Sequence, residues 1–172
     1  YIQKSRFLST QAREPVTHYE HKELGYNYRM SNVLASIGRG QLINIESIIN
    51  KRRLIYDYYF KNLSELSGVN FMEEPEYSKS NRWLTTLTLD KNKTGFSPKD
   101  VINALENKNI ESRPVWKPMH LQPLYKKYEF FHLEEDYASI LFKNGLCLPS
   151  GTCLSIEDQN RIIDTIYSLG KN

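Results

Sequence analysis

The stretch ELGYNYRMSNVLA, residues 23–35, decides how this 172-residue sequence is organised. A polar, aromatic turn runs straight into an amphipathic helix, for which Ser31 is a typical N-cap. Asn27 and Arg29 stand just before the helix N-terminus, where backbone N–H groups and the helix dipole favour anions. The turn is therefore a candidate phosphate site. In the alternative interpretation, Asn27 and Arg29 only satisfy backbone carbonyls of the preceding loop.

The apolar positions continue at helical spacing well beyond this turn. We expect one long connecting helix over residues 31–66, on the order of 50 Å at about 1.5 Å per residue. A helix of that length cannot be covered by one small core, so it joins two lobes or lies along a subunit interface. Gly38 and Gly40 are positions where it would bend. The alternative is two helices with a break near Lys51.

The rest of the sequence predicts a small α+β domain of capped helices and short strands. Pro114 places its strand at an edge, because proline lacks an amide donor. Ser97 and Ser155 each begin a capping box, and Gly145 is expected to end a helix in the left-handed conformation. The predicted strands are residues 83–89, 110–116 and 146–148, and the predicted helices, besides residues 1–8, are 97–107, 134–143 and 155–169.

A second concentration of functional side chains lies in residues 111–125. Arg113, Lys117 and His120 are cationic or donor groups, and Trp116 and Tyr125 offer flat surfaces. Prolines stiffen the loop that presents them, a combination that suits a nucleotide diphosphate. The alternative is a stiff surface loop whose tryptophan packs into the core.

Composition limits the possible functions. The 23 Lys and Arg residues barely exceed the 20 Asp and Glu residues and are mixed with them, which argues against a nucleic-acid partner. No apolar run is long enough for a membrane span, and the two cysteines resemble neither a redox pair nor a zinc site, so we expect a cytoplasmic protein with reduced thiols and no membrane partner. The four histidines lack the spacing of metal ligands, and no metal is expected.

Taken together, the motifs resemble the DegT/DnrJ/EryC1/StrS aminotransferases, a family of pyridoxal 5'-phosphate-dependent sugar aminotransferases. The resemblance covers nearly the whole chain in the right order. Within the family, the sequence is most similar to enzymes that act on UDP-4-keto-6-deoxy-N-acetylhexosamines. The segments that carry it are FLSTQAREP (7–15), HYEH (18–21), GYNYRMSNVLA (25–35), RPVWKPMH (113–120) and LPS (148–150).

The resemblance implies the C-terminal portion of a type I, aspartate aminotransferase-like fold. Residues 1–30 would end the large domain and carry the cofactor and substrate loop, residues 31–66 would form the connecting helix, and residues 67–172 the C-terminal small domain. The family's Schiff-base lysine lies in a Ser-Phe-x-x-x-Lys segment that has no counterpart in this sequence. We therefore expect no catalytic residue here and no activity from the chain alone.

The resemblance also assigns roles to individual residues. Asn27 matches the position that reaches across a homodimer to the cofactor phosphate of the partner subunit. Tyr26 and Arg29 would order this turn or touch the nucleotide sugar. Arg113, Trp116 and His120 match the loop that lines the substrate entrance, and are expected to be substrate-binding.

The implied reaction transfers an amino group from an amino acid donor, commonly glutamate, to the C4 ketone of a nucleotide-linked 4-keto-6-deoxy sugar, in surface-glycan biosynthesis. The cofactor provides the electron sink for such chemistry. The alternative is a non-catalytic remnant that keeps the domain for dimerisation or for binding a nucleotide sugar.

Overall fold

A computed structural model describes residues 1–170, so the last two residues of the predicted domain 67–172 lie outside the described range. The chain forms two compact units, one spanning Tyr1–Ile45 and the other beginning at Glu46. Across the described residues, no helix is long and apolar enough to cross a membrane.

The first unit contains helix α1 (Ile2–Leu8), an irregular hairpin and helix α2 (Asn32–Ile43). The two arms of the hairpin pair through backbone hydrogen bonds. The Gln11 N–H donates to the Tyr26 carbonyl (3.0 Å), and the Tyr28 N–H donates to the Ser9 carbonyl (3.0 Å). Isolated bridges at Thr10–Asn27 and Arg13–His21 continue this antiparallel pairing. The turn that precedes α2 is thus anchored to the end of α1.

The predicted continuous helix over residues 31–66 is wrong. The chain forms two helices, α2 and α3 (Ile45–Leu63), separated at Asn44, whose φ of −102° and ψ of 6° leave the helical region. The Asn44 N–H bonds back to the carbonyls of Gln41 and Leu42, closing α2 with a tighter turn. Asparagine favours such ends because its side chain competes for backbone hydrogen bonds. The break lies at neither of the expected glycines, and not near Lys51.

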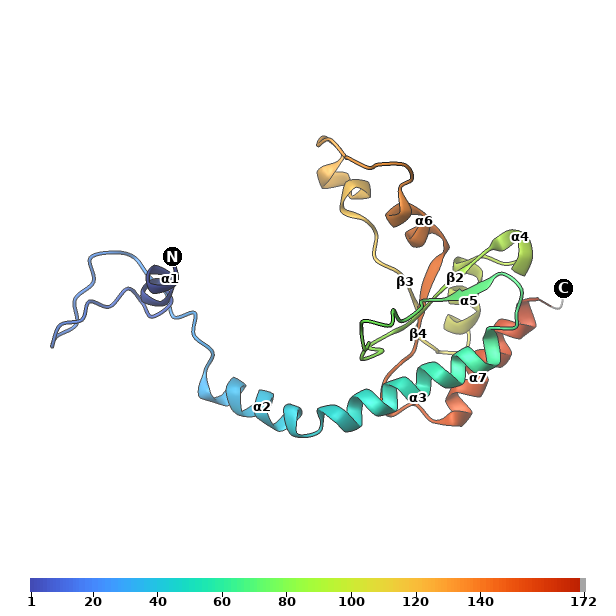
Figure 1. Ribbon diagram of the computed structural model, residues 1–172, viewed down its shortest axis with the longest axis horizontal. Helices are drawn as coiled ribbons and strands as arrows, with labels where there is room; N and C mark the ends of the chain where they lie inside the picture. Colours follow the sequence, from blue (N-terminus) through green and yellow to red (C-terminus); the bar gives the residue numbers. More distant parts are fainter. Residues whose placement is uncertain (171–172) are drawn as a thin grey trace. The chain divides into compact units, whose positions relative to one another are not determined.

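The second unit is built on a four-stranded antiparallel sheet in the order β1-β2-β4-β3 (Figure 1). Strands β2 (Thr85–Leu89) and β4 (Gly145–Leu148) confirm two predicted strands. Strand β3 (Arg113–Pro114) is at the edge, as Pro114 predicts, but is only two residues long. Strand β1 (Val69–Phe71) was not predicted.

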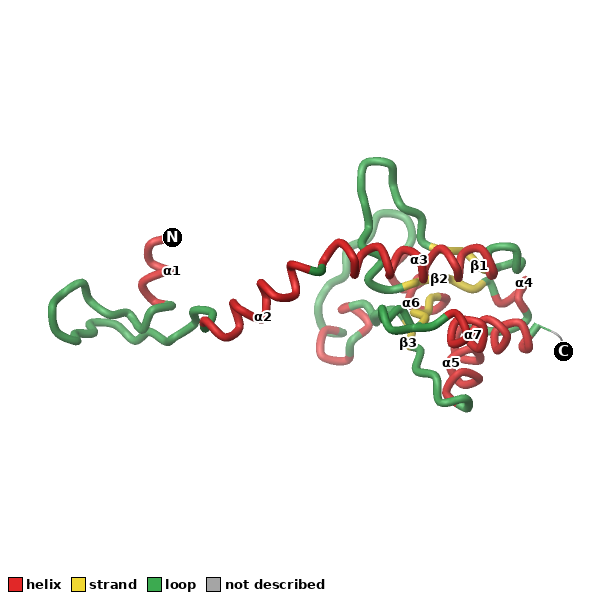
Figure 2. Tube along the Cα trace, turned by 90° about the horizontal axis from the view of Figure 1, so that it is seen from below, coloured by secondary structure: helices red, strands yellow, loops and turns green. Residues whose placement is uncertain are grey.

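Three helices pack on this sheet: α3, α5 (Pro98–Glu106) and α7 (Ile156–Leu169). In β2, Leu87 and Leu89 are buried in the core while the alternate threonines are partly exposed, as the alternation predicts. Figures 1 and 2 show α3 beside α7, where the Gln159 side-chain amide donates to the Ile55 carbonyl at 3.0 Å. The smaller elements are α4 (Lys91–Thr94), the 3-10 turns Met119–Leu121 and Pro123–Tyr125, and α6 (Tyr137–Asn144).

The caps agree with the sequence except at Gly145. Both capping boxes, Ser97 with Asp100 and Ser155 with Asp158, are formed. Gly145 is not left-handed: its φ is −102° and it begins strand β4 directly after α6. Close packing against Val115, and not a turn, explains why this position is a glycine. Both cysteines are free; Cys147 is buried and Cys153 is exposed.

Candidate functional site

The turn at residues 25–29 is fixed by close backbone packing. Ala12 is fully buried, and a Cβ built on Gly25 would lie 2.5 Å from the Ala12 nitrogen. Only glycine therefore allows the two arms to come this close. The Asn27 Oδ1 accepts a hydrogen bond from the Arg29 N–H at 3.4 Å, which closes the turn. Two residues further on, the Ser31 hydroxyl caps α2 by accepting from the Leu34 N–H at 3.3 Å.

This arrangement leaves hydrogen-bond donors for a ligand. Within residues 1–170, neither the Asn27 side-chain amide nor the Arg29 guanidinium donates to a backbone carbonyl, unlike in the alternative interpretation. Arg29 lines a hollow of about 530 Å³ with Arg6, Ser9 and Thr10. Tyr26 is exposed beside Tyr28, with ring centroids 5.6 Å apart. The Ser9 and Thr10 hydroxyls already donate to the Arg6 carbonyl, at 3.0 and 2.9 Å. The Asn27 amide and the guanidinium groups of Arg6 and Arg29 are the donors that suit a phosphate.

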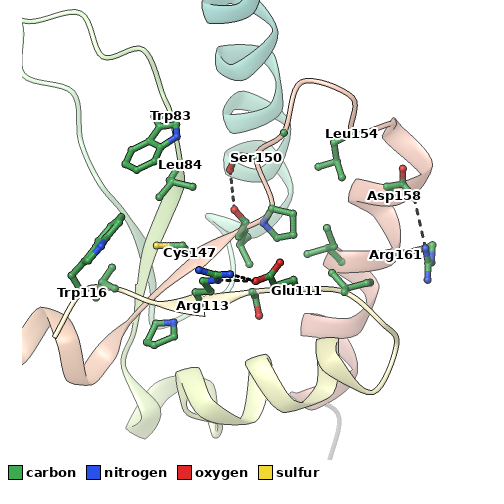
Figure 3. A pocket seen from close by; sticks show the side chains of 18 of the residues that line it. Trp83, Leu84, Glu111, Arg113, Trp116, Cys147, Ser150, Leu154, Asp158 and Arg161 are labelled. Carbon is green, nitrogen blue, oxygen red and sulfur yellow. Dashed lines mark hydrogen bonds and ion pairs between the residues drawn. The ribbon is translucent and has the colours of Figure 1, made fainter. Parts of the chain in front are cut away.

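The second unit contains a larger cavity of about 880 Å³, here called the Trp cavity. It lies where the β3–β4 pairing ends, between the chain that precedes β3 and the chain that follows β4. Figure 3 shows Trp83 and Trp116 at one end, and Asp158 and Arg161 at the other. Its lining includes Trp83, Glu111, Ser112, Arg113, Trp116, Cys147, Ser150 and Arg161.

The polar groups of the Trp cavity differ in exposure and in whether they already form hydrogen bonds. The Arg113 Nε donates to the Glu111 carboxylate at 2.7 Å, yet the Arg113 side chain is 77% exposed and accessible to a ligand. Burial raises the pKa of the Cys147 thiol, which keeps it protonated and unreactive. The buried Ser112 Oγ has no hydrogen-bond partner among the described residues. The cavity therefore combines a mostly apolar lining with two exposed guanidinium groups, those of Arg113 and Arg161.

Hydrogen bonds from the core hold the wall formed by residues 148–151. The hydroxyl of Tyr59, a fully buried residue of α3, donates to the Pro149 carbonyl at 3.1 Å. The Ser150 hydroxyl donates to the Leu148 carbonyl at 2.9 Å and accepts from the Thr85 N–H at 2.8 Å. The LPS motif thus has a structural role in which Ser150 ties β4 to β2.

His120 lies in a different cluster and does not line the Trp cavity. Its Nε2 is 2.8 Å from Asp136 Oδ2 and 3.0 Å from Ser139 Oγ, and its ring stacks on Phe130 with centroids 3.7 Å apart. Asp136 also caps α6 by accepting from the Ser139 N–H. The hydrogen bonds from Ser139, and then His120, lower the pKa of Asp136. This cluster fastens the loop after β3 to the start of α6.

The structure thus brings Arg113 and Trp116 together in one cavity and places His120 elsewhere in the same unit. Trp83 was missed as a site residue, since its position at the start of a predicted strand indicated only packing. The available signal was rarity: the chain has two tryptophans, and both line this cavity. Within residues 1–170, no three His, Cys, Asp or Glu side chains are grouped as metal ligands would be.

Comparison with known proteins decides the family. The model of the DegT/DnrJ/EryC1/StrS aminotransferase family matches residues 2–167, almost the whole chain. The chain belongs to this family. The aminotransferase family uses pyridoxal 5'-phosphate, and the α+β unit with its small antiparallel sheet matches part of the type I fold, as predicted.

Among relatives in the family, EpsN of Bacillus subtilis, named as a pyridoxal phosphate-dependent aminotransferase, is 48% identical over 98% of this chain. GDP-perosamine synthase of Escherichia coli O157:H7 is 35% identical over 86% of it. The sugar aminotransferase Spr1654 of Streptococcus pneumoniae, in its PLP form, superposes with a TM-score of 0.81 at 25% identity, covering 98% of this chain and 43% of that one. The chain spans 43% of EpsN and 38% of the synthase.

Proposed function

We propose that this chain is the C-terminal part of a nucleotide-sugar aminotransferase, to which it contributes a phosphate-binding turn and part of a substrate pocket. The observation that carries the proposal is the turn at Asn27, whose side-chain amide is available just before the capped N-terminus of α2. The match of the family model to residues 2–167 supports the proposal. The lysine that such enzymes require is not in this sequence, so we expect the chain alone to be inactive.

The donor set at the turn fits the phosphate of pyridoxal 5'-phosphate. Asn27 would donate its amide to a phosphate oxygen, and Arg29 would add positive charge nearby. The first N–H groups of α2 favour an anion at the same end of the helix. When bound, the cofactor supplies the electron sink for amino transfer. In the proposed homodimer, Asn27 serves the cofactor of the partner subunit.

The Trp cavity is the proposed substrate side of the second unit. Arg113 would pair with a diphosphate, because a guanidinium forms two parallel hydrogen bonds to phosphate oxygens. Trp116 would offer a flat surface to the nucleotide sugar. His120 would act through the loop, as it holds the chain after Trp116 against α6. Tyr26 is proposed as a contact of the sugar from the turn.

The proposed reaction moves an amino group from glutamate to the C4 ketone of a nucleotide-linked 4-keto-6-deoxy sugar. The sequence resemblance favours UDP as the carrier, while three relatives are named for a GDP-linked product. The proposal includes a cytoplasmic location, with which two free cysteines agree. A non-catalytic remnant that binds a nucleotide sugar is the second candidate.

The test is an assay of the full-length gene product beside the 172-residue chain. Glutamate is the donor, and 4-keto-6-deoxy sugars carried on UDP and on GDP are the acceptors. The proposal expects amino transfer by the full-length product with one of the carriers and none by the chain. Nucleotide-sugar binding without turnover by the full-length product would support the remnant instead, and turnover by the chain alone would contradict both.

A further inference from the structure

A cluster of three charged side chains joins helix α3 to the loop before β2. The Arg53 guanidinium donates to both Glu74 oxygens, at 2.9 and 2.8 Å, and to the Ser80 carbonyl at 2.7 Å. Glu74 also accepts from the Ser80 N–H and lies 3.6 Å from Arg82 Nη2. The side chains of Glu74 and Arg82 are only 18% and 10% exposed. The loop is therefore held at several points by the carboxylate of Glu74.

Arg82 is held in a conformation that its residue type rarely adopts. Its φ is +47°, in the left-handed region. Its guanidinium stacks on the Tyr56 ring of α3, 3.7 Å from the centroid, and donates to the Met72 carbonyl at 3.0 Å. A non-glycine residue persists there only when its surroundings over-determine it, and such positions concentrate at functional sites. The residue that follows this conformation is Trp83.

Trp83 follows Arg82 directly and enters the Trp cavity. Its indole faces Trp116 with ring centroids 6.0 Å apart, and it is 57% exposed (Figure 3). We propose that Trp83 forms a second aromatic wall of the Trp cavity, and that the Arg53–Glu74–Arg82 cluster positions it there. Arg53 lies on α3, and Glu74 and Arg82 lie on the loop before β2. None of the three lines the cavity.

The charge state of the cluster agrees with this role. Hydrogen bonds from Arg53, and then from the Ser80 N–H, lower the pKa of Glu74 to about 2. Glu74 therefore remains ionised at any pH at which the protein is handled. Because Arg53 and Arg82 are always protonated, the cluster is a constant support and not a switch.

The positioning role is tested on the 172-residue chain, whose only tryptophans are Trp83 and Trp116. Two indoles in contact give an exciton couplet in circular dichroism. Glu74→Gln keeps the shape of the side chain but removes its charge, and we expect the couplet to be lost while cooperative unfolding is retained. Glu106→Gln, at an exposed glutamate of α5, removes a charge elsewhere and should leave the couplet intact. An unchanged couplet in Glu74→Gln would overturn the positioning role.

Two further variants separate positioning from general stability. Val101→Ala weakens the core at a buried residue of α5 and should lower the unfolding midpoint without loss of the couplet. If Glu74→Gln fails to fold, Arg82→Lys takes its place, because lysine keeps the charge but cannot stack its head group on Tyr56 as arginine does. Loss of the couplet in a folded Arg82→Lys supports the inference, and retention contradicts it.

The ligand role of Trp83 rests on the proposed function of the Trp cavity, and UDP and GDP are the probes. Stacking of a base on an aromatic side chain predicts that Trp83→Ala weakens nucleotide binding roughly 5- to 150-fold, while Trp83→Phe stays near the unmodified chain. Equal binding by Trp83→Ala would overturn the ligand role alone. No binding by the unmodified chain would overturn the ligand role, while the couplet still decides the positioning role and the assay of the full-length gene product decides the proposed function.

Discussion

Gly145 lies directly against Val115: a Cβ on Gly145 would be 2.6 Å from the Val115 Cγ2 and 2.5 Å from the Leu141 carbonyl oxygen. Val115 follows the edge strand β3 and precedes Trp116, so this contact sets how closely that segment approaches the sheet. A glycine predicted to end a helix thus serves to place one wall of the Trp cavity.

Replacing Gly145 by alanine should therefore disturb the cavity. Overpacking a tight contact costs typically 1–3 kcal/mol, so we expect about that loss of stability, with a change in tryptophan fluorescence as the segment that carries Trp116 moves outward. Chemical denaturation monitored by fluorescence measures both. Gly151→Ala is the matched control, because its Cβ would meet nothing closer than the Cys153 sulfur at 3.8 Å. Equal behaviour of the two variants would refute the packing argument.

Gly25→Ala should loosen the turn that carries Asn27. The added Cβ would lie 2.5 Å from the Ala12 nitrogen, in backbone that cannot yield easily. We expect the N–H groups of Tyr26 and Tyr28, which donate to the carbonyls of Leu8 and Ser9 at the end of α1, to lose protection from hydrogen exchange.

Gly40→Ala is the control for that variant. Its Cβ meets nothing within 4 Å in α2, so it should stabilise the helix, by up to about 1 kcal/mol from helix propensity. Retained protection of the turn in Gly25→Ala would show that the close approach to Ala12 is not needed.

The sequence predicted what local chemistry determines. Ser31, Ser97 and Ser155 were identified as caps because the capping pattern is contained within four residues. The alternation in β2 was visible because one face of the sheet is buried and the other is partly exposed. Such signals need no knowledge of distant contacts.

The remainder depends on tertiary contacts that no short pattern contains. The apolar spacing continues through Asn44, so the break between α2 and α3 leaves no gap in the periodicity. Trp83 meets Trp116 and His120 meets Asp136 only because the fold brings distant segments together. Strand β1 has three residues and relies on its pairing with β2. The expected domain boundaries and the individual site roles stay predictions.

The His120 cluster should weaken in acid. The pKa of Asp136 is lowered in the folded protein, so its contribution to stability is present above its unfolded pKa, about 3.9, and is lost as the pH falls through the lower folded value. We expect hydrogen-exchange protection of the first turn of α6 to fall below about pH 4. Asp136→Asn should remove this pH dependence, and Glu135→Gln, at an exposed neighbour, should retain it. If the pH dependence survives in Asp136→Asn, another group is responsible for it.

The central claim, that the Asn27 turn holds the phosphate of pyridoxal 5'-phosphate, is tested most directly by titrating the cofactor into the full-length gene product carrying Asn27→Asp. Aspartate keeps the acceptor that closes the turn on the Arg29 N–H, but it replaces the amide donor by a negative charge. A hydrogen bond to a charged group is worth about 1.5–3 kcal/mol, so affinity should fall at least about tenfold. Asn70→Ala, at an exposed asparagine of β1, should bind as the unmodified protein does. Unchanged cofactor affinity in Asn27→Asp would contradict the claim.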